Sequence, residues 1–575
     1  MENESAPQKS QSANSLDLTG DYLAEKSKLR KSFGRKEVLF FSICSVIGLD
    51  TIGVVAAAGP EAISWMAVLA IVFLIPASMV IAELSAAFTA QGGPYLWVRL
   101  AFGRLTGSIA AVISWLKSPI WFGGILAFVA VATAETFFMS GTQMSQFSFY
   151  RFALAFIWIG IIAANLSFKV GKWVPILGGL SRLVLIPFFT ITVIVFGIAN
   201  GLRGVVFSDF GLSFDGLLAT IGIILFAFLG LENVSAASDE MTHAKRDLPY
   251  AAFRTSALAM LLYGVPILTV LLVLPIGQVN GLTGFVDALK SAFTVYGGSI
   301  AEDGTVTLTG AGSYLGAFAG VLIIIAVFAS GVTWLMSTNR NLAAACLDGA
   351  GPRWIAFTNP RYGTPVRLNN ITGIIASAIL ILGYRLNDGD VAKYFGVAVG
   401  FAIAMSLVNY LAIFPAFWVL RNRYPDATRP YRVPAHRTVS IWLTVVVAFG
   451  VTQLLAPGFG DKWFSDAYRP AGWVADQGRP YYLTELAVLL AVVVVDLMAP
   501  NPPNEGFADV DEEDGGDEED DDPNKFADVE LILFVAGDEE LLIAAPLPKL
   551  NPPALLPLLP AALAAVVVFE LELAP

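Results

Sequence analysis

The stretch Gly48-Leu49-Asp50-Thr51-Ile52-Gly53 interrupts the first long apolar segment of this chain, and Gly230-Leu231-Glu232-Asn233-Val234-Ser235 interrupts the sixth. Both read glycine, leucine, an acid, a hydroxyl or amide side chain and a β-branched apolar residue, 182 positions apart. Glycine lowers helix propensity by about 1 kcal/mol, and an acid inside a membrane helix costs roughly 2.5–3.5 kcal/mol. The pair predicts two membrane helices that unwind at corresponding positions, as in inverted-repeat membrane proteins. A chance match, or glycines that serve only helix packing, are the alternatives.

The composition is that of a membrane protein. Of 575 residues 56% are hydrophobic and 14% are charged, whereas about a quarter of the residues of a soluble protein are charged. Apolar stretches of roughly 20 residues recur, long enough to span a bilayer as helices, and they do not alternate as barrel strands would. We predict an all-α membrane protein with about twelve transmembrane helices. The predicted spans are 36–58, 64–88, 106–138, 150–168, 173–199, 217–237, 251–276, 313–341, 365–384, 394–421, 439–456 and 481–498.

The net charge of −12 comes from the C-terminal tail. Residues 501–575 hold 19 Asp or Glu and 2 Lys, which gives −17 and leaves +5 for residues 1–500. The two cysteines, Cys44 and Cys346, and the two histidines, His243 and His436, form no disulfide framework or metal-ligand spacing. We therefore expect no metal, no cofactor, no nucleic-acid partner and no enzyme.

The distribution of Lys and Arg predicts the orientation. With the N-terminus inside, the inner loops hold 16 of these residues and the outer loops 8, a bias that favours both termini in the cytoplasm of a cell-membrane protein. Residues 1–35 hold no secretory signal and form a cytoplasmic segment. The predicted order continues with a first repeat (36–199), a second repeat (200–421), helices 11 and 12 (422–500) and an acidic, then low-complexity tail (501–575). We expect that tail to be disordered, and the loop 277–312 to be external.

Four motifs, in order, resemble those of the amino acid–polyamine–organocation superfamily of permeases, over roughly residues 34–500. They are Gln91-Gly92-Gly93-Pro94-Tyr95-Leu96-Trp97-Val98 with Ala101-Phe102-Gly103, then Phe226-Ala227-Phe228-Leu229-Gly230-Leu231-Glu232 leading to Asp239-Glu240-Met241, then Arg340 with Asp348-Gly349, and finally Ser406-Leu407 and Tyr410 followed by Arg429-Pro430-Tyr431-Arg432-Val433-Pro434. Each motif alone is weak, but four at matching helix positions are specific.

The resemblance implies a five-plus-five inverted repeat with two further helices and alternating access to a central site. It implies that the helix-1 break, Gly48 to Gly53, offers backbone N–H groups to a substrate carboxylate. The helix-6 break would offer carbonyls to an amino group, with Gly230, Glu232 and Asn233 in the site. Phe226 and Phe228 match the position of a gating aromatic, and Glu232 matches an acid that some relatives use for proton or pH sensing.

Charged residues depart from the family pattern. Relatives often have Gly-Ser-Gly where this chain has Leu49-Asp50-Thr51, and an ionised Asp50 would repel a carboxylate but could pair with an amine. Many relatives carry a helix-5 lysine in place of a sodium ion; Arg182 is nearest here but two residues out of register. Lys117, in helix 3, either snorkels, is a counter-ion to an acid such as Glu135, or is a cation in the substrate site that partners Asp50. Trp115, Trp121 and Trp334 are candidate cavity residues, with packing or interface anchoring as the alternative.

The predicted function is that of a secondary transporter for amino acids, proton-coupled or an exchanger. The segment between the helix-1 break and helix 2 is short, similar to that of glutamate/γ-aminobutyrate exchangers. A permease for cationic amines or polyamines is the alternative, because Asp50 and Glu232 suit a charged amine. A non-transporting membrane sensor or scaffold is a third reading. The expected partners are the small-molecule substrate and membrane lipid.

Overall fold

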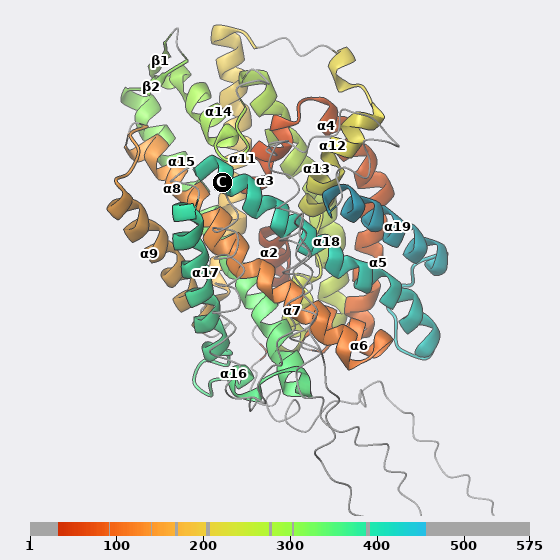
Figure 1. Cartoon of the computed structure of the whole chain (residues 1–575). Helices are drawn as coiled ribbons and strands as arrows, with labels where there is room; N and C mark the ends of the chain where they lie inside the picture. Colours follow the sequence, from red (N-terminus) through yellow and green to blue (C-terminus); the bar gives the residue numbers. More distant parts are fainter. Residues whose placement is uncertain are drawn as a thin grey trace, which may run out of the picture. The chain divides into compact units, whose positions relative to one another are not determined.

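The computed structural model describes residues 31, 33–90, 92–139, 141–166, 171–202, 207–274, 279–301, 304–386 and 391–455 (Figure 1). The chain divides into two units, Met1–Pro500 and Asn501–Pro575, and every described residue belongs to the first. The predicted twelfth helix (481–498), the tail (501–575) and nearly all of the N-terminal segment (1–35) lie outside the described residues.

The described chain is helical almost throughout. Its first part comprises α2 (Arg35–Val46), α3 (Leu49–Ala57), α4 (Glu61–Leu69), η1 (Ala70–Leu74), α5 (Ile75–Ala87), α6 (Gly93–Phe102), α7 (Arg104–Trp121), η2 (Phe122–Leu126), α8 (Ala127–Phe138), α9 (Gln146–Asn165), α11 (Trp173–Asn200) and η3 (Phe207–Phe210). Its second part comprises α12 (Phe214–Ala227), η4 (Asn233–Glu240), α13 (Ala244–Val273), α14 (Gly284–Phe293), η6 (Thr294–Tyr296), β1 (Gly298–Ile300), β2 (Val306–Leu308), α15 (Gly310–Ala345), η7 (Cys346–Ala350), α16 (Arg353–Ala356), α17 (Val366–Leu386), α18 (Val391–Arg423) and α19 (His436–Leu455).

Nine helices within the described ranges are long and apolar enough to cross a membrane. Their burial separates a centre from a periphery. The helix over Arg35–Ala57 has 83% of its apolar window buried, against 33% for Trp173–Asn200. The outward face of α11 exposes large apolar side chains such as Ile191, Ile194 and Ile198, as expected of a surface that meets lipid rather than water. The helix-1 segment therefore lies at the centre of the bundle, where a site can be enclosed.

Helices occupy the positions of the first eleven predicted spans, because apolar runs of this length have few other stable forms in a membrane. The seventh, α13, begins at Ala244 rather than at 251 and contains Pro249. The prediction of loop structure over 277–312 is wrong in part. This segment contains α14, whose apolar side chains are buried, and the antiparallel hairpin β1–β2, in which Ser299 pairs with Thr307.

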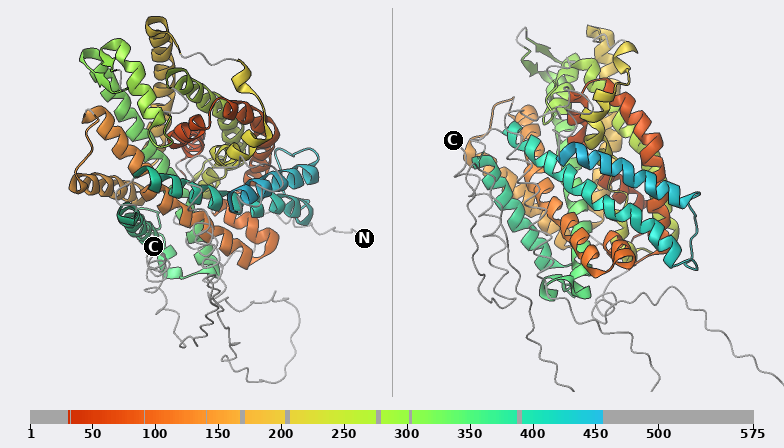
Figure 2. Two further views of the ribbon diagram at one scale, coloured as in Figure 1. Left: turned by 45° about the horizontal axis from the view of Figure 1, so that its top comes forward. Right: turned by 45° about the vertical axis from the view of Figure 1, so that its right-hand side comes forward.

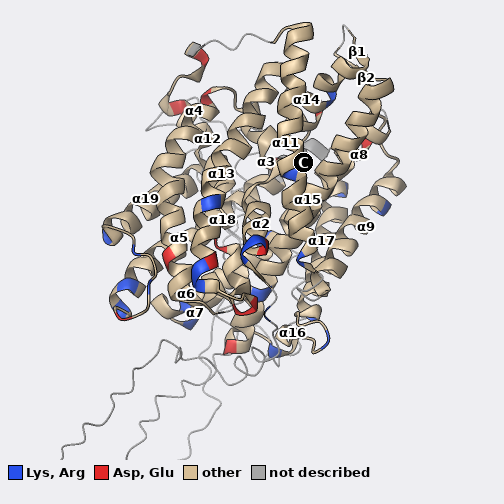
Figure 3. Cartoon of the chain, turned by 180° about the vertical axis from the view of Figure 1, so that it is seen from behind, with Lys and Arg blue, Asp and Glu red and all other residues tan. Residues whose placement is uncertain are grey.

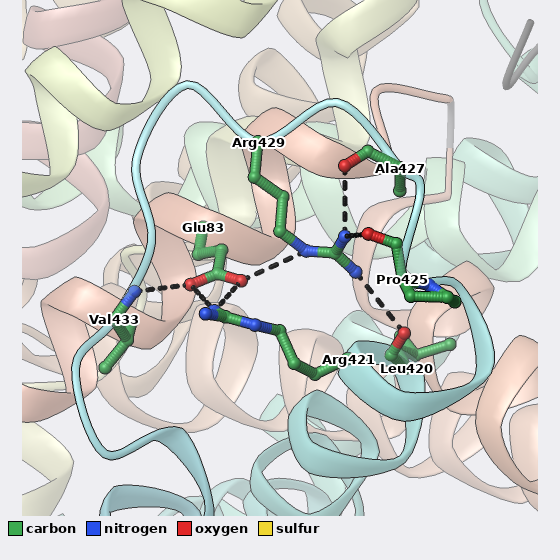
Figure 4. A network of polar contacts seen from close by, with 7 residues as sticks. All are labelled: Glu83, Leu420, Arg421, Pro425, Ala427, Arg429 and Val433. Carbon is green, nitrogen blue, oxygen red and sulfur yellow. Dashed lines mark hydrogen bonds and ion pairs between the residues drawn. The ribbon is translucent and has the colours of Figure 1, made fainter.

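Ion pairs and hydrogen bonds connect neighbouring helices at the end of the bundle where α2 begins. We call this end the N-terminal side. Helices α18 and α19 run side by side (Figure 2), and the loop between them is fixed by Glu83 of α5. The Glu83 carboxylate contacts Arg421, lies 3.1 Å from Arg429 Nε and accepts a hydrogen bond of 2.6 Å from the Val433 N–H (Figure 4). Two arginines on one buried carboxylate give this acid a structural role in holding α5 to α18.

Candidate functional site

The first membrane helix is interrupted, and the interruption is shorter than the sequence predicts. Helix α2 ends at Val46 and α3 begins at Leu49, so the extended residues are Ile47 and Gly48. Leu49, Asp50, Thr51, Ile52 and Gly53 form the first turns of α3 instead of unwound chain. Gly53 is required for packing, since a Cβ atom there would come within 2.6 Å of the Gly281 carbonyl oxygen.

Side chains from other helices satisfy the backbone groups that this interruption frees. The Tyr263 hydroxyl of α13 donates to the Val46 carbonyl at 2.7 Å and accepts from the Gly48 N–H at 2.8 Å. Arg182 of α11 donates from Nε to the Ile47 carbonyl at 2.6 Å and from an Nη atom to the Ala326 carbonyl of α15 at 2.9 Å. Arg182 is fully buried, and these hydrogen bonds brace helix 1 against α15.

The sixth membrane helix is interrupted as well. Helix α12 ends at Ala227 and η4 begins at Asn233. Between them Gly230 has φ +106°, a conformation that favours glycine. The Gly230 N–H donates to Glu232 Oε2 at 3.0 Å, and the hydroxyl of Tyr410 on α18 donates to the same oxygen. Glu232 thus folds back over its own break and is held by α18.

The two interruptions contact each other directly. Ser45 Oγ, at the end of α2, donates to the Gly230 carbonyl at 3.0 Å, and Asn233 Nδ2 donates to Ser45 Oγ at 2.6 Å. Helix α15 closes the group, because Trp334 Nε1 donates to the Ser45 carbonyl at 2.9 Å and Ser337 Oγ to the Asn233 carbonyl at 2.8 Å. The sequence therefore identified two stretches that the fold brings together.

Asp50 and Lys117 face this junction from α3 and α7. Asp50 Oδ2 accepts a hydrogen bond of 2.9 Å from Trp121 Nε1. The Lys117 ammonium lies 4.1 Å from the ring centroid of Trp334 and interacts electrostatically with Glu232. The pairing of Lys117 with Asp50 or Glu135 stays a prediction. Among the described residues it has no hydrogen-bond acceptor, while Glu135 accepts from the Met144 N–H at 2.7 Å.

The predicted aromatic residues flank the helix-6 break. Phe228 lies in the break and is 1% exposed, whereas Phe226, in the last turn of α12, is only partly buried. Trp121 and Trp334 meet edge to face with 5.3 Å between ring centroids. These two tryptophans connect Asp50 with Lys117.

The site is closed in this structure. Asp50, Glu232 and Lys117 are 4%, 2% and 2% exposed, so a molecule can reach them only if helices move. On the N-terminal side buried ion pairs join neighbouring segments, Arg340 with Glu240 at 3.2 Å and Arg99 with Asp348. On the opposite side the segment before α14 packs closely against α3, because the Gly281 carbonyl oxygen lies next to Gly53.

Sequence reasoning missed the roles of Tyr263, Ser45 and Ser337. Tyr410 stood in a motif but carried no predicted contact. These residues touch partners more than 100 positions away along the chain, and nothing in their local sequence indicates such contacts. A buried hydroxyl in an apolar run is a weak signal on its own.

Comparison with known proteins agrees with this geometry. The model of the amino acid permease family matches residues 33–475. An uncharacterized transporter of Legionella pneumophila is 26% identical over 428 residues, 73% of this chain and 87% of the relative. A probable agmatine/putrescine antiporter of Lactococcus lactis is 25% identical over 410 residues, 70% and 83%. A glutamate/gamma-aminobutyrate antiporter of the same species is 22% identical over 375 residues, 63% and 69%. The chain therefore belongs to the amino acid permease family and is a multi-pass membrane protein that works as a secondary transporter.

Proposed function

We propose that this protein carries a small amino acid across the cell membrane by alternating access, coupled to protons or in exchange for a second solute. The observation that carries the proposal is the closed junction of two interrupted helices, with Asp50, Lys117 and Glu232 buried around it. Charged groups inside a membrane protein mark substrate and ion pathways. The similarity to a glutamate/gamma-aminobutyrate antiporter supports the exchange of amino acids.

The architecture we propose is a five-plus-five inverted repeat, with residues 36–199 and 200–421 as its halves and two helices in 422–500, twelve spans in all. The matching sequences at the two breaks support it. We place both termini, including segments 1–35 and 501–575, in the cytoplasm. Lys and Arg gather toward the end of the helices where α6 and α16 lie (Figure 3), which is the pattern of a cytoplasmic face.

We assign the substrate site to Gly48–Gly53 of the first interrupted helix and to Phe226, Phe228, Gly230, Glu232 and Asn233 of the sixth. Arg182 acts as a brace between the first interrupted helix and α15. Glu232 is the group to which we assign the coupling of transport to protons. Its replacement in Glu232→Gln keeps an oxygen acceptor for Gly230 and Tyr410 but cannot bind or release a proton.

Cationic amines are the second candidate substrate. The acids Asp50 and Glu232 support it, as does the similarity to a probable agmatine/putrescine antiporter. The two candidate classes of substrate differ in charge, so measured uptake of each class distinguishes them.

The purified full chain in proteoliposomes provides the test. Uptake of labelled leucine, glutamate, γ-aminobutyrate, agmatine and putrescine is measured at an acidic and a neutral pH, with and without solute inside. We expect uptake of at least one amino acid, and a weaker pH dependence in Glu232→Gln than in wild type. Uptake of amines alone would replace the first candidate by the second. Absence of uptake for every probe under both conditions would contradict transport of either class.

A further inference from the structure

Three backbone groups at the two breaks are already bonded within this chain. The Gly48 N–H is bonded to Tyr263, the Ile47 carbonyl to Arg182, and the Gly230 carbonyl to Ser45. These groups would otherwise be the free donors and acceptors that unwound helices present to a ligand. Because these three groups are bonded, side chains beside the breaks are the groups to consider for recognition of the substrate charges.

A carboxylate from the protein itself lies at the start of α3. A Cβ atom at Gly48 would come within 2.6 Å of Asp50 Oδ1, so this oxygen folds back over the break at the N-terminal end of the helix. A helix N-terminus favours one negative charge, and Asp50 supplies it. A substrate carboxylate at the same place would meet this anion at close range, whereas a substrate ammonium would be attracted to it.

Two opposite charges in the site are left incompletely bonded. Asp50 Oδ1 and Lys117 Nζ have no hydrogen-bond partner among the described residues, although both side chains are more than nine-tenths buried. Glu232 and Arg182, by contrast, are held by hydrogen bonds from or to neighbouring helices. Burying a charge is unfavourable unless a partner compensates it, so both atoms are suited to a ligand that supplies one donor and one acceptor.

The same two tryptophans border both charges. Trp121 bonds to the other oxygen of Asp50, and Lys117, four residues earlier on the same face of α7, lies over Trp334. The rings of Trp121 and Trp334 are in contact. A single small molecule lying along these rings would therefore have Asp50 at one end and Lys117 at the other.

From these contacts we propose that the substrate is a zwitterion whose ammonium binds Asp50 Oδ1 and whose carboxylate binds Lys117. The inference deepens the proposed function and depends on it. It selects amino acids over polyamines, because a second ammonium of a polyamine would meet the Lys117 ammonium instead of a carboxylate.

Charge-removing variants test the assignment in the full-length protein in proteoliposomes. The amino acid that wild type takes up fastest is the labelled substrate, and two of its analogues are tested as inhibitors of its uptake. One analogue is the amine without the carboxylate, and the other is the acid without the amino group. For leucine these are 3-methylbutylamine and 4-methylpentanoate. Lys172→Met, which removes a partly exposed partner of Glu37 far from the site, is the matched control.

In Lys117→Met we expect the KM for the amino acid to rise at least about tenfold, the usual loss for one charged hydrogen bond, while the amine becomes a stronger inhibitor than in wild type. In Asp50→Asn the acid becomes the stronger inhibitor. Lys172→Met keeps the wild-type KM and inhibition order. Removal of the Lys117 ammonium, which has no hydrogen-bond partner among the described residues, also raises the melting temperature of the substrate-free protein and reduces the further rise that the amino acid produces.

The outcomes separate the two levels of the proposal. Amino acid uptake by wild type with unchanged KM and unchanged inhibition order in Lys117→Met and Asp50→Asn would overturn the zwitterion assignment alone. Uptake of putrescine or agmatine but of no zwitterion would overturn it and leave an amine transporter. If wild type moves none of the probes and none shifts its melting temperature, the proposed function fails together with it.

Discussion

The hydroxyl of Tyr263 shows how far the interrupted first helix depends on one distant side chain. It donates to the Val46 carbonyl, accepts from the Gly48 N–H and lies 3.3 Å from Thr51 Oγ1. The break would otherwise leave buried backbone groups without partners, and these are unfavourable in a dry interior. The conformation of residues 47 and 48 is therefore stabilised from α13 rather than by its own sequence.

Tyr263→Phe removes this hydroxyl and little else. We expect a loss of about 1–3 kcal/mol for each backbone group left unsatisfied, seen as a lower melting temperature in detergent together with slower uptake. Tyr150→Phe is the control, because the Tyr150 hydroxyl is buried with no partner among the described residues. Equal melting temperatures for the two variants would contradict the role given to Tyr263.

The sequence revealed the charged residues of the site more readily than the neutral ones. Asp50, Glu232 and Arg182 stand out because a charge in an apolar segment is rare and needs a reason. Their partners did not stand out. The contact of Gly48 with Tyr263 spans 215 positions and that of Gly230 with Tyr410 spans 180, and a single sequence carries no record of such pairs.

At the scale of elements, α14 is a buried helix within a segment that the sequence indicated as a loop. Phe285, Val286, Leu289 and Phe293 are all buried, at spacings of three and four that indicate one apolar helical face. The Gly- and Thr-rich flanks obscured this pattern, while the spanning helices were evident from length and hydropathy alone. The segment leading into α14 packs against α3 and covers the site on that side.

Asp287 makes the stability of α14 depend on pH. Burial raises the pKa of its carboxyl above the ordinary 3.8, although Thr283 donates to it at 2.6 Å and Lys290 opposes the shift. The charged form is therefore disfavoured in the folded protein, and stability is lost as the pH rises from 3.8 through the folded pKa. Asp287→Asn removes this loss. We expect its melting temperature to exceed that of wild type at neutral pH, with the difference shrinking toward pH 3.8.

The control for this prediction is Asp215→Asn, which changes an exposed acid in the first turn of α12. A difference between Asp287→Asn and wild type that stays constant across the pH series would show that burial of the carboxyl is not its cause.

For the described bundle as a whole, closure involves both sides of the membrane at once. The ion pairs of Glu240 and Asp348 block the N-terminal side, and the approach of residue 281 to Gly53 blocks the other. Alternating access requires each closure to open in turn. The pair of Glu240 with Arg340 joins η4 to α15, so we expect it to break when that side opens.

Glu240→Gln removes the charge of one partner of the buried Arg340 guanidinium, which destabilises the closed state more than an open, hydrated one. We expect hydrogen–deuterium exchange over residues 233–243 to accelerate by roughly tenfold or more, since 1.4 kcal/mol corresponds to a factor of ten. Glu37→Gln is the control, because it breaks a partly exposed pair with Lys172 on the same side, where ion pairs contribute little. Similar exchange in both variants would mean that the Glu240 pair does not hold this side closed.

The pairing of Phe33 with the chain beyond η4 sets a practical limit on shortening the polypeptide. Its N–H bonds to the Glu240 carbonyl at 3.0 Å, its carbonyl accepts from the Thr242 N–H at 3.0 Å, and its ring is fully buried. A truncation that removes only residues before 33 keeps these hydrogen bonds. One that also removes Phe33 breaks them and releases the start of the first helix and the end of the sixth helix together. A fluorescent reporter fused directly ahead of residue 33 would, by the same contacts, be attached to one of the segments whose displacement it is meant to detect.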